Sequence, residues 1–281
     1  MTGLAEIAYR PRGTFANAAI GTHRSKMIGG DGVFRDQALF WCCPDARRID
    51  IRATLNDPFG ETYVRRFEQR RAIDVYALVD LSGSMRYEGS ASKLALSASL
   101  CVSLAYSVTR IGDRFGLIGC DERIREDVFL PATRVRRAAV AAGKRLLSVP
   151  CYGSSVEGLL DAAVLLGGRR KLVLLISDFR QNFTFLEKLF DALSLHDVAP
   201  ICLVDPDEEN LPHWGLTEIA DLESGRRRLI VLRPSLRARW LALEVLRRRA
   251  LERLSARYGR GLYTMKGQID SRDLTRYLLS H

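Results

Sequence analysis

The clearest candidate for chemistry is the run Asp80-Leu81-Ser82-Gly83-Ser84, which directly follows an apolar, strand-forming stretch, residues 73–79. Its carboxylate and two hydroxyls stand at alternate positions and offer hard oxygen donors, which suit Mg²⁺ or Mn²⁺ and not a soft metal. Mg²⁺ takes about six oxygen ligands and keeps some of them as water. Asp80, Ser82 and Ser84 are therefore predicted to form one part of a divalent-metal site that other loops complete.

Two later loops carry donors of the same kind. The first contains Ser154, with Ser155 as an alternative ligand, and it precedes a predicted helix. The second begins with Asp178, which follows residues 171–177, the most hydrophobic strand-like stretch of the chain. Open parallel sheets gather their ligands at the carboxyl ends of the strands. We therefore expect Mg²⁺ or Mn²⁺ to be held by Asp80, Ser82, Ser84, Ser154 and Asp178.

From residue 73 onward, short apolar runs alternate with helical patterns. The runs predicted as strands are 73–79, 115–120, 171–177 and 199–204. The segments with helical periodicity are 92–109, 133–147, 155–166 and 183–195. Continuous apolar strands that alternate with helices are typical of a parallel sheet covered on both faces. The predicted fold class is α/β, with a doubly wound, mostly parallel sheet and helices on both faces.

The two ends of the chain differ from this middle part. Residues 1–72 are rich in Gly and Arg and show weak periodicity, which predicts an extended N-terminal region with brief strands, packed on a main domain of residues 73–281. Farther on, Glu223-Ser224-Gly225 predicts a hairpin turn and residues 235–258 a long helix. The remaining predicted elements are a strand at 261–265 and a helix at 271–279.

The three-loop arrangement resembles the metal-ion-dependent adhesion site of von Willebrand factor A domains, in which Asp-x-Ser-x-Ser is followed by a Thr and then by an Asp. The first part matches at Asp80, Ser82 and Ser84, and the third part at Asp178. Ser154 stands in place of the Thr and keeps its hydroxyl. In those domains the cation keeps one position open for an acidic side chain of a partner. The resemblance therefore implies a non-catalytic, metal-dependent protein-binding module.

The chain upstream of the motif also resembles a bacterial family, the domain of unknown function 58 (DUF58), whose members pair such a segment with a von Willebrand factor A-like half. The residues that carry this resemblance are Gly21, His23, Ser25, Gly29, Gly30, Phe34, Arg35 and Arg48-Ile49-Asp50. Members are often encoded beside MoxR-type AAA ATPases, and short members without a membrane span are similar to accessory proteins of methanol oxidation.

This second resemblance implies an accessory role with a MoxR-type ATPase in the assembly or activation of a client protein, such as a methanol dehydrogenase system. The ATPase or the client would contribute the acidic residue that completes the metal site. The chain departs from the family at Cys42-Cys43-Pro44-Asp45, where relatives usually carry Gly-Asp-Asp. It also departs at Ile51, which replaces a usual Trp.

The charge distribution leaves two other functions open. The net charge of +10 is concentrated in residues 211–281, with 15 basic and 7 acidic side chains, and the runs Arg226–Arg228 and Arg247–Arg249 are an alternative sign of nucleic-acid binding. We favour solvated faces or an acidic protein partner, because exposed aromatic residues are not interleaved with these arginines. A metal-dependent hydrolase is the second alternative, since a bound cation can activate water, but no general base is placed near the motif. The acidic run 205–209 is predicted to be a solvated loop.

The composition also bears on the compartment. Hydrophobic residues make up 47% of the chain, enough for a folded core. The most apolar segment, Leu94 to Val108, contains four serines and is predicted to be a buried helix and not a membrane span. The first 30 residues show no apolar signal region, and the six cysteines show no CxxC pair or zinc spacing. We expect a cytoplasmic protein with reduced cysteines and no membrane span.

Overall fold

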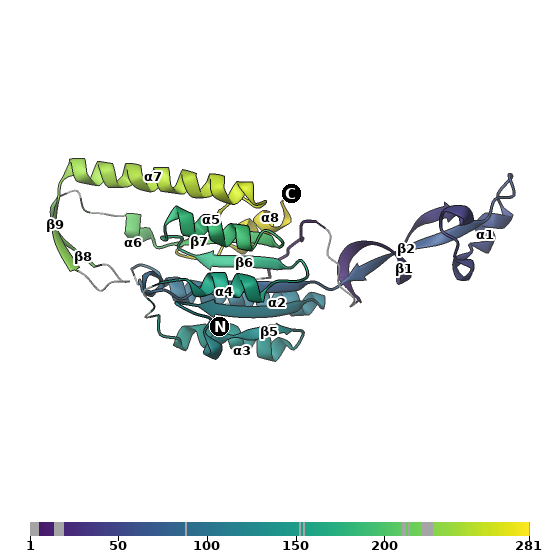
Figure 1. Cartoon of the computed structure of the whole chain (residues 1–281), viewed down its shortest axis with the longest axis horizontal. Coiled ribbons are helices and arrows are strands. Elements are labelled where there is room, and N and C mark those ends of the chain that lie inside the picture. Colours follow the sequence, from purple (N-terminus) through teal and green to yellow (C-terminus); the bar gives the residue numbers. More distant parts are fainter. Residues whose placement is uncertain are drawn as a thin grey trace. The chain divides into compact units, whose positions relative to one another are not determined.

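The computed structural model describes residues 6–13, 20–87, 89–151, 153, 155–209, 212, 214–220 and 227–280. The chain forms two compact units, one of Thr14–Ile73 and one of Met1–Gly13 together with Asp74–His281. The colours of Figure 1 follow the chain through both. The second and larger unit contains the predicted metal motif.

The larger unit is built on a six-stranded sheet with the order β10-β7-β6-β3-β4-β5. Its strands are β3 (Asp74–Asp80), β4 (Arg114–Cys120), β5 (Leu130–Thr133), β6 (Leu172–Ser177), β7 (Asp197–Val204) and β10 (Tyr263–Lys266). Every neighbouring pair is parallel except β4 and β5. The first strand of this sheet along the chain is β3, and later strands are added on both sides of it. The sheet is therefore doubly wound, which confirms the predicted fold class.

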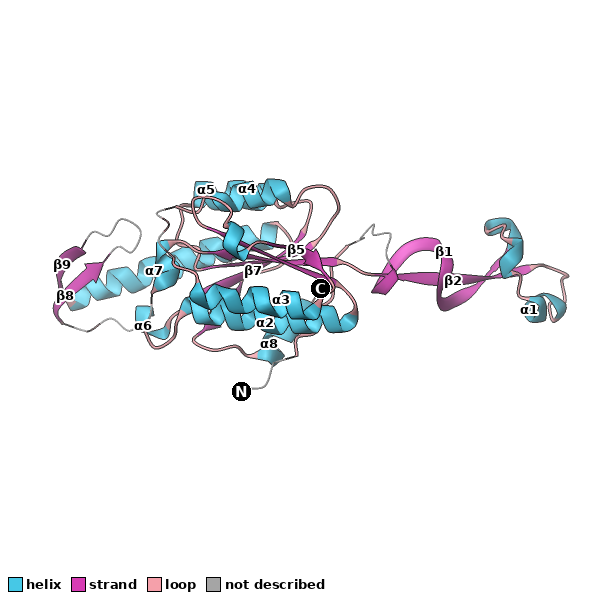
Figure 2. Cartoon of the chain, turned by 90° about the horizontal axis from the view of Figure 1, so that it is seen from below, coloured by secondary structure: helices cyan, strands magenta, loops and turns pink. Residues whose placement is uncertain are grey.

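Helices cover both faces of this sheet, as Figure 2 shows. On one face lie α2 (Lys93–Ile111), α3 (Arg136–Arg145) and α8 (Ser271–Leu279). On the other lie α4 (Gly158–Leu165), α5 (Phe183–Ala192) and the C-terminal half of α7 (Pro234–Arg257), whose Leu251 and Leu254 join the core. The short α6 (Pro206–Glu209) follows β7. The chemistry-bearing loops leave the carboxyl ends of β3 and β6, at the point where the winding reverses.

Helix α2 packs against one face of the sheet and is largely buried. The Ser92 side chain caps its first turn by accepting from the Ala95 amide at 3.2 Å, and Gly112 ends it at a φ of 93° that favours glycine. Among the described residues, α2 is also the one helix long and apolar enough to cross a bilayer. More than half of that stretch, 56%, is buried inside the protein, where Leu100 and Leu104 are fully covered.

The strand β5 was not predicted from the sequence. It is only four residues long and contains Pro131, which lacks the amide proton that a central strand needs. It pairs antiparallel with β4 at the edge of the sheet. A short edge strand with a proline gives no apolar run or alternation to detect.

A hairpin and the long helix α7 extend the larger unit. The strands β8 (Gly215–Ala220) and β9 (Arg227–Leu232) pair antiparallel, on either side of the predicted turn, whose residues lie outside the described part of the chain. The first half of α7 leaves large apolar side chains exposed, among them Leu236, Trp240 and Leu243. Only the second half packs on the sheet.

The smaller unit is a two-stranded antiparallel ribbon of β1 (Ile20–Leu39) and β2 (Tyr63–Arg71). Its register shifts at four places, two of which, between Arg24 and Val33, span the glycine-rich stretch. The connection holds three short helices, η1 (Phe40–Cys42), η2 (Ala46–Arg48) and α1 (Ile51–Leu55). Asp50 caps α1 and accepts from Arg65 at 2.9 Å, and this ion-paired hydrogen bond holds the pKa of Asp50 well below its usual range.

Residues 6–13 belong to the larger unit. Ile7 is fully buried and its amide donates to Ser107 Oγ on α2 at 3.0 Å. The Arg12 amide donates to Asp197 Oδ2 at 2.6 Å, and the buried guanidinium of Arg260 donates to the Arg10 carbonyl. The N-terminal segment, residues 6–13, thus completes the core between α2 and the start of β7.

Candidate metal centre

Asp80 ends strand β3 and is completely buried. Its Oδ1 accepts from the Ser82 amide at 2.8 Å, and its Oδ2 accepts from Ser177 Oγ at 2.6 Å and from Gln181 Nε2 at 3.0 Å. Ser177 is the last residue of β6, and Gln181 lies in the loop that follows it. These hydrogen bonds fix the orientation of the carboxylate, so that the two strand ends act as one structure.

The two motif serines lie side by side. Ser82 Oγ and Ser84 Oγ are 3.1 Å apart, in the short 3₁₀ turn η3 (Gly83–Arg86) and its N-cap. In an octahedral shell with Mg–O distances of about 2.1 Å, neighbouring ligand oxygens are ~3.0 Å apart. The hydroxyl pair therefore fits two adjacent positions around one small cation, and Asp80 supplies a carboxylate at the start of the same turn.

The loop around Gly153, which was predicted to supply a further hydroxyl ligand, runs beside the motif. The Gly83 amide donates to the Gly153 carbonyl at 2.9 Å, and Ser82 and Gly153 form an isolated parallel bridge. Ser154 itself lies outside the described residues, so its side chain is not placed. Ser155 is described and partly exposed. The backbone contact brings this loop, which precedes α4, to the metal motif.

Asp178 follows β6 and is also buried. Its Oδ2 accepts from the ammonium of Lys93 at 3.0 Å, and its Oδ1 accepts from the Arg180 amide at 3.3 Å. Burial, and next the negative charge of Asp178, raise the pKa of Asp80 to about 6. The two predicted carboxylates are therefore close enough to repel one another, which is the arrangement that a shared cation relieves.

Sequence reasoning did not single out Lys93, Ser177 or Gln181. Ser177 and Gln181 hold Asp80, and Lys93 holds Asp178. The one signal for Lys93 was its place in the first turn of an apolar helix, where a cation opposes the helix dipole. Ser177 and Gln181 gave no signal, because their roles depend on hydrogen bonds to Asp80, which lies 97 and 101 residues away from them in the chain.

The loop from Ser177 to Gln181 has a second set of contacts on its other side. The guanidinium of Arg247, on α7, donates to the carbonyls of Phe179 and Gln181. Arg180 pairs with Glu244 on α7 at 2.6 Å and with Glu208 on α6 at 3.3 Å. Glu208 in turn binds Lys93 at 2.5 Å. Alternating charges therefore connect the predicted metal loop with α6 and α7.

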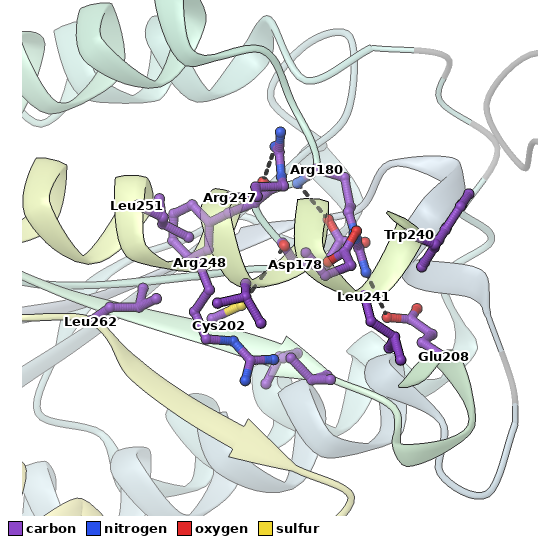
Figure 3. A pocket seen from close by; sticks show the side chains of 15 residues that line it. Asp178, Arg180, Cys202, Glu208, Trp240, Leu241, Arg247, Arg248, Leu251 and Leu262 are labelled. Atoms are coloured by element: carbon purple, nitrogen blue, oxygen red, sulfur yellow. Dashed lines mark hydrogen bonds and ion pairs between the residues drawn. The ribbon is translucent and has the colours of Figure 1, made fainter. Parts of the chain in front are cut away.

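A pocket of about 430 Å³ lies between α7 and the carboxyl ends of β6 and β7 (Figure 3). Trp240, Leu241 and Leu251 form much of its apolar wall, and Arg180 and Glu208 lie at its polar side. Asp178 also lines it. The pocket and the predicted metal ligands thus share the loop after β6.

The acidic run 205–209 was predicted to be a solvated loop, and this is wrong for its first residue, Asp205. Asp205 is fully buried and accepts hydrogen bonds from the amides of Gly89, Ala91 and Asp207. It therefore anchors the segment before α2.

No cluster of three or more His, Cys, Asp or Glu side chains arranged to hold a metal occurs among the described residues, and all six cysteines are free.

The larger unit is a doubly wound α/β domain with an oxygen-donor motif at the carboxyl end of the inner strand β3. The chain matches the family described as "Protein of unknown function DUF58" over residues 43–250, and it belongs to that family. An uncharacterized protein of Mycobacterium tuberculosis is 25% identical over 77% of this chain and 69% of its own length. A protein of Paracoccus denitrificans, described as an uncharacterized protein in the moxR 3′ region, is 38% identical over 32% of this chain and 87% of its own length.

Solved structures with a similar fold have low sequence identity. The BatB protein of Bacteroides thetaiotaomicron is 16% identical, with a TM-score of 0.46 over 74% of this chain and 97% of that chain. A von Willebrand factor type A protein of Catenulispora acidiphila is also 16% identical, with a TM-score of 0.35 over 68% of this chain and 42% of that chain.

Proposed function

We propose that this protein is a non-catalytic, divalent-metal-dependent protein-binding module. The observation that carries the proposal is the pair of hydroxyls of Ser82 and Ser84, 3.1 Å apart beside the fixed carboxylate of Asp80. Asp80, Ser82, Ser84 and Asp178 would hold Mg²⁺ or Mn²⁺, with Ser154 as the donor of the remaining loop. A bound Mg²⁺ supplies a Lewis-acidic position for a carboxylate of the partner.

The protein's own residues preorganise this site. Ser177 and Gln181 keep the Asp80 carboxylate in one orientation, and the 3₁₀ turn keeps the two serines adjacent. Neutral hydroxyl ligands leave positive charge on the ion, which favours an acidic partner.

We further propose that the partner is a MoxR-type AAA ATPase, or its client. Membership of the DUF58 family and the similarity to a Paracoccus protein from the moxR 3′ region support this proposal. The module would act as an accessory factor in the assembly or activation of the client, for which a methanol dehydrogenase system is one candidate. The free cysteines, most of them buried, support a reducing, cytoplasmic setting.

The first test is thermal stability with and without the metal. A ligand present at 100 times its Kd stabilises the folded state by about 2.7 kcal/mol, so millimolar Mg²⁺ should raise the Tm of the wild-type chain. Asp80→Ala should lose this response. The matched control is Asp273→Asn, which changes an exposed carboxylate of α8 and should keep it. An equal response in Asp80→Ala and the wild type would contradict the metal site.

The second test is capture of the purified MoxR-type ATPase from the same organism, in Mg²⁺ and in EDTA. The proposal expects binding in Mg²⁺ to the wild type and to Asp273→Asn, and none in EDTA or to Asp80→Ala. Binding in all conditions would contradict a metal-bridged contact. A phosphatase panel run on the same proteins tests the hydrolase alternative, since Mg²⁺-dependent turnover lost in Asp80→Ala would overturn the non-catalytic assignment.

A further inference from the structure

Lys93 is a buried lysine at the edge of the candidate metal centre. It is 1% exposed, and its ammonium lies 3.0 Å from Asp178 Oδ2 and 2.5 Å from Glu208 Oε1. Lysine is almost never fully buried unless it is paired. Lys93 also begins helix α2, where a cation opposes the positive end of the helix dipole. Burial and the helix dipole both disfavour a charged lysine at this position, and the carboxylates of Asp178 and Glu208 offset both effects.

This pairing makes the two predicted carboxylate ligands unequal. Asp178 has a cation in contact with one oxygen and a backbone amide on the other. The hydrogen-bond donors to Asp80 are all neutral: the Ser82 amide, the Ser177 hydroxyl and the Gln181 amide group. The charge of Asp178 is therefore partly compensated by Lys93, which Glu208 shares, whereas Asp80 has no cation in contact.

We propose that Lys93 sets the charge of the metal centre and thereby its preference for an acidic partner. With Asp178 partly compensated, Asp80 is the proposed carboxylate ligand, among the described residues, whose negative charge no contacting cation reduces. The centre then keeps net positive charge and takes a carboxylate from outside. This inference rests on the proposed function, because it requires that Asp80, Ser82 and Ser84 hold a divalent cation.

A purely structural role for Lys93 gives a different expectation. If Lys93 only stabilised α2, its removal would lower the Tm without tightening metal binding. If it sets the charge of the centre, its removal frees the negative charge of Asp178 and metal binding tightens. Glu208→Gln provides the matched control, since it removes the other carboxylate partner of Lys93 and leaves the ion pair of Lys93 with Asp178 in place.

The experiment measures Mn²⁺ affinity of the full chain by electron paramagnetic resonance of the free ion. Asp80→Ala should abolish binding at the site. Lys93→Gln should bind Mn²⁺ about tenfold more tightly or better, because a unit charge near the site is removed in a medium of low effective dielectric. Glu208→Gln should not bind more tightly. A folded Lys93→Gln variant with unchanged or weaker Mn²⁺ affinity would overturn the inference.

A second measurement uses the wild type, so that it stands even where Lys93→Gln fails to fold. Water-proton relaxation counts the waters on bound Mn²⁺, and added acetate should displace one of them in the wild type. Acetate without effect on the wild type would overturn the inference about Lys93. If the wild type binds no Mn²⁺, or Asp80→Ala binds it equally, the proposed function itself fails. The two failures are therefore distinct.

Discussion

Arg247 on α7 donates to the carbonyl oxygen of Phe179, 2.5 Å away, in the loop that orients the predicted metal ligands. Phe179 has a φ of 52° and is the one described non-glycine residue in the left-handed region, a conformation that costs about 1–3 kcal/mol. Its ring is buried against Phe190 of α5. The turn at Phe179 lets Gln181 reach Asp80, and Arg247 holds that turn from outside.

Removing the Arg247 guanidinium should loosen this loop. In Arg247→Met two carbonyl oxygens, of Phe179 and Gln181, lose their donor, and unfolding free energy should fall by about 1–3 kcal/mol. Mn²⁺ affinity should fall as well, because Gln181 no longer holds Asp80 in place. Arg249→Met is the control, since Arg249 is exposed on the same helix. Equal metal affinity in Arg247→Met and the wild type would show that α7 does not support the site.

A second prediction concerns the buried ion pair of Arg260 and Asp197. The guanidinium donates to both carboxylate oxygens at 2.9 Å and to the Leu278 carbonyl at 3.0 Å, with both side chains covered. Arg260→Met leaves a buried charge without its partner and should lower the free energy of unfolding by about 3–5 kcal/mol. Urea unfolding measures the loss. Replacing both partners, in Arg260→Met with Asp197→Leu, should cost less than Arg260→Met alone; a greater cost would contradict the argument.

Stability should also fall in mild acid because of His196. This side chain is 3% exposed, and its Nδ1 has no hydrogen-bond partner among the described residues. Burial, and next the positive charges of Lys171 and Arg170, lower the pKa of His196 from 6.5 to about 4. The unfolded chain therefore binds a proton that the folded chain refuses, and the stability present above pH 6.5 is lost as pH falls toward 4.

The size of this effect can be measured by urea unfolding. Between pH 7.5 and pH 5 the His196 contribution should be a loss of about 1–2 kcal/mol. A His196→Gln variant should lose less stability over the same interval, since it has no group that titrates there. The same pH dependence in both proteins would show that other groups dominate.

The sequence predicted the parallel strands of the sheet, and it carries the candidate metal motif, because both depend on local patterns. The apolar run before Asp80 and the run before Asp178 each define a buried strand, and the alternate spacing of Asp80, Ser82 and Ser84 is visible in five residues. The contacts that orient those ligands join residues far apart in the chain. Lys93 meets Asp178 across 85 residues, so that no spacing rule could pair them. Arg247 appeared only as one of a run of arginines.

The last prediction concerns the loop before α4, in which Gly153 lies very close to Asp121. A Cβ atom at Gly153 would lie 2.6 Å from the Cβ of Asp121, closer than two such carbons can pack. Asp121 is held in turn by Arg125 at 2.9 Å, so it cannot move away freely. Gly153→Ala should therefore push this loop from Ser82, to which its backbone is bridged.

The expected result of Gly153→Ala is weaker Mn²⁺ binding without any change to Asp80, Ser82, Ser84 or Asp178. Ser154→Ala and Ser155→Ala separate the donor from the loop that carries it. If Ser154 is the ligand, its variant should reproduce the loss seen in Gly153→Ala, while Ser155→Ala keeps the wild-type affinity. The reverse result would assign the role to Ser155. Full affinity in all three variants would mean that the metal centre needs no ligand from this loop, and that water or a partner supplies the position instead.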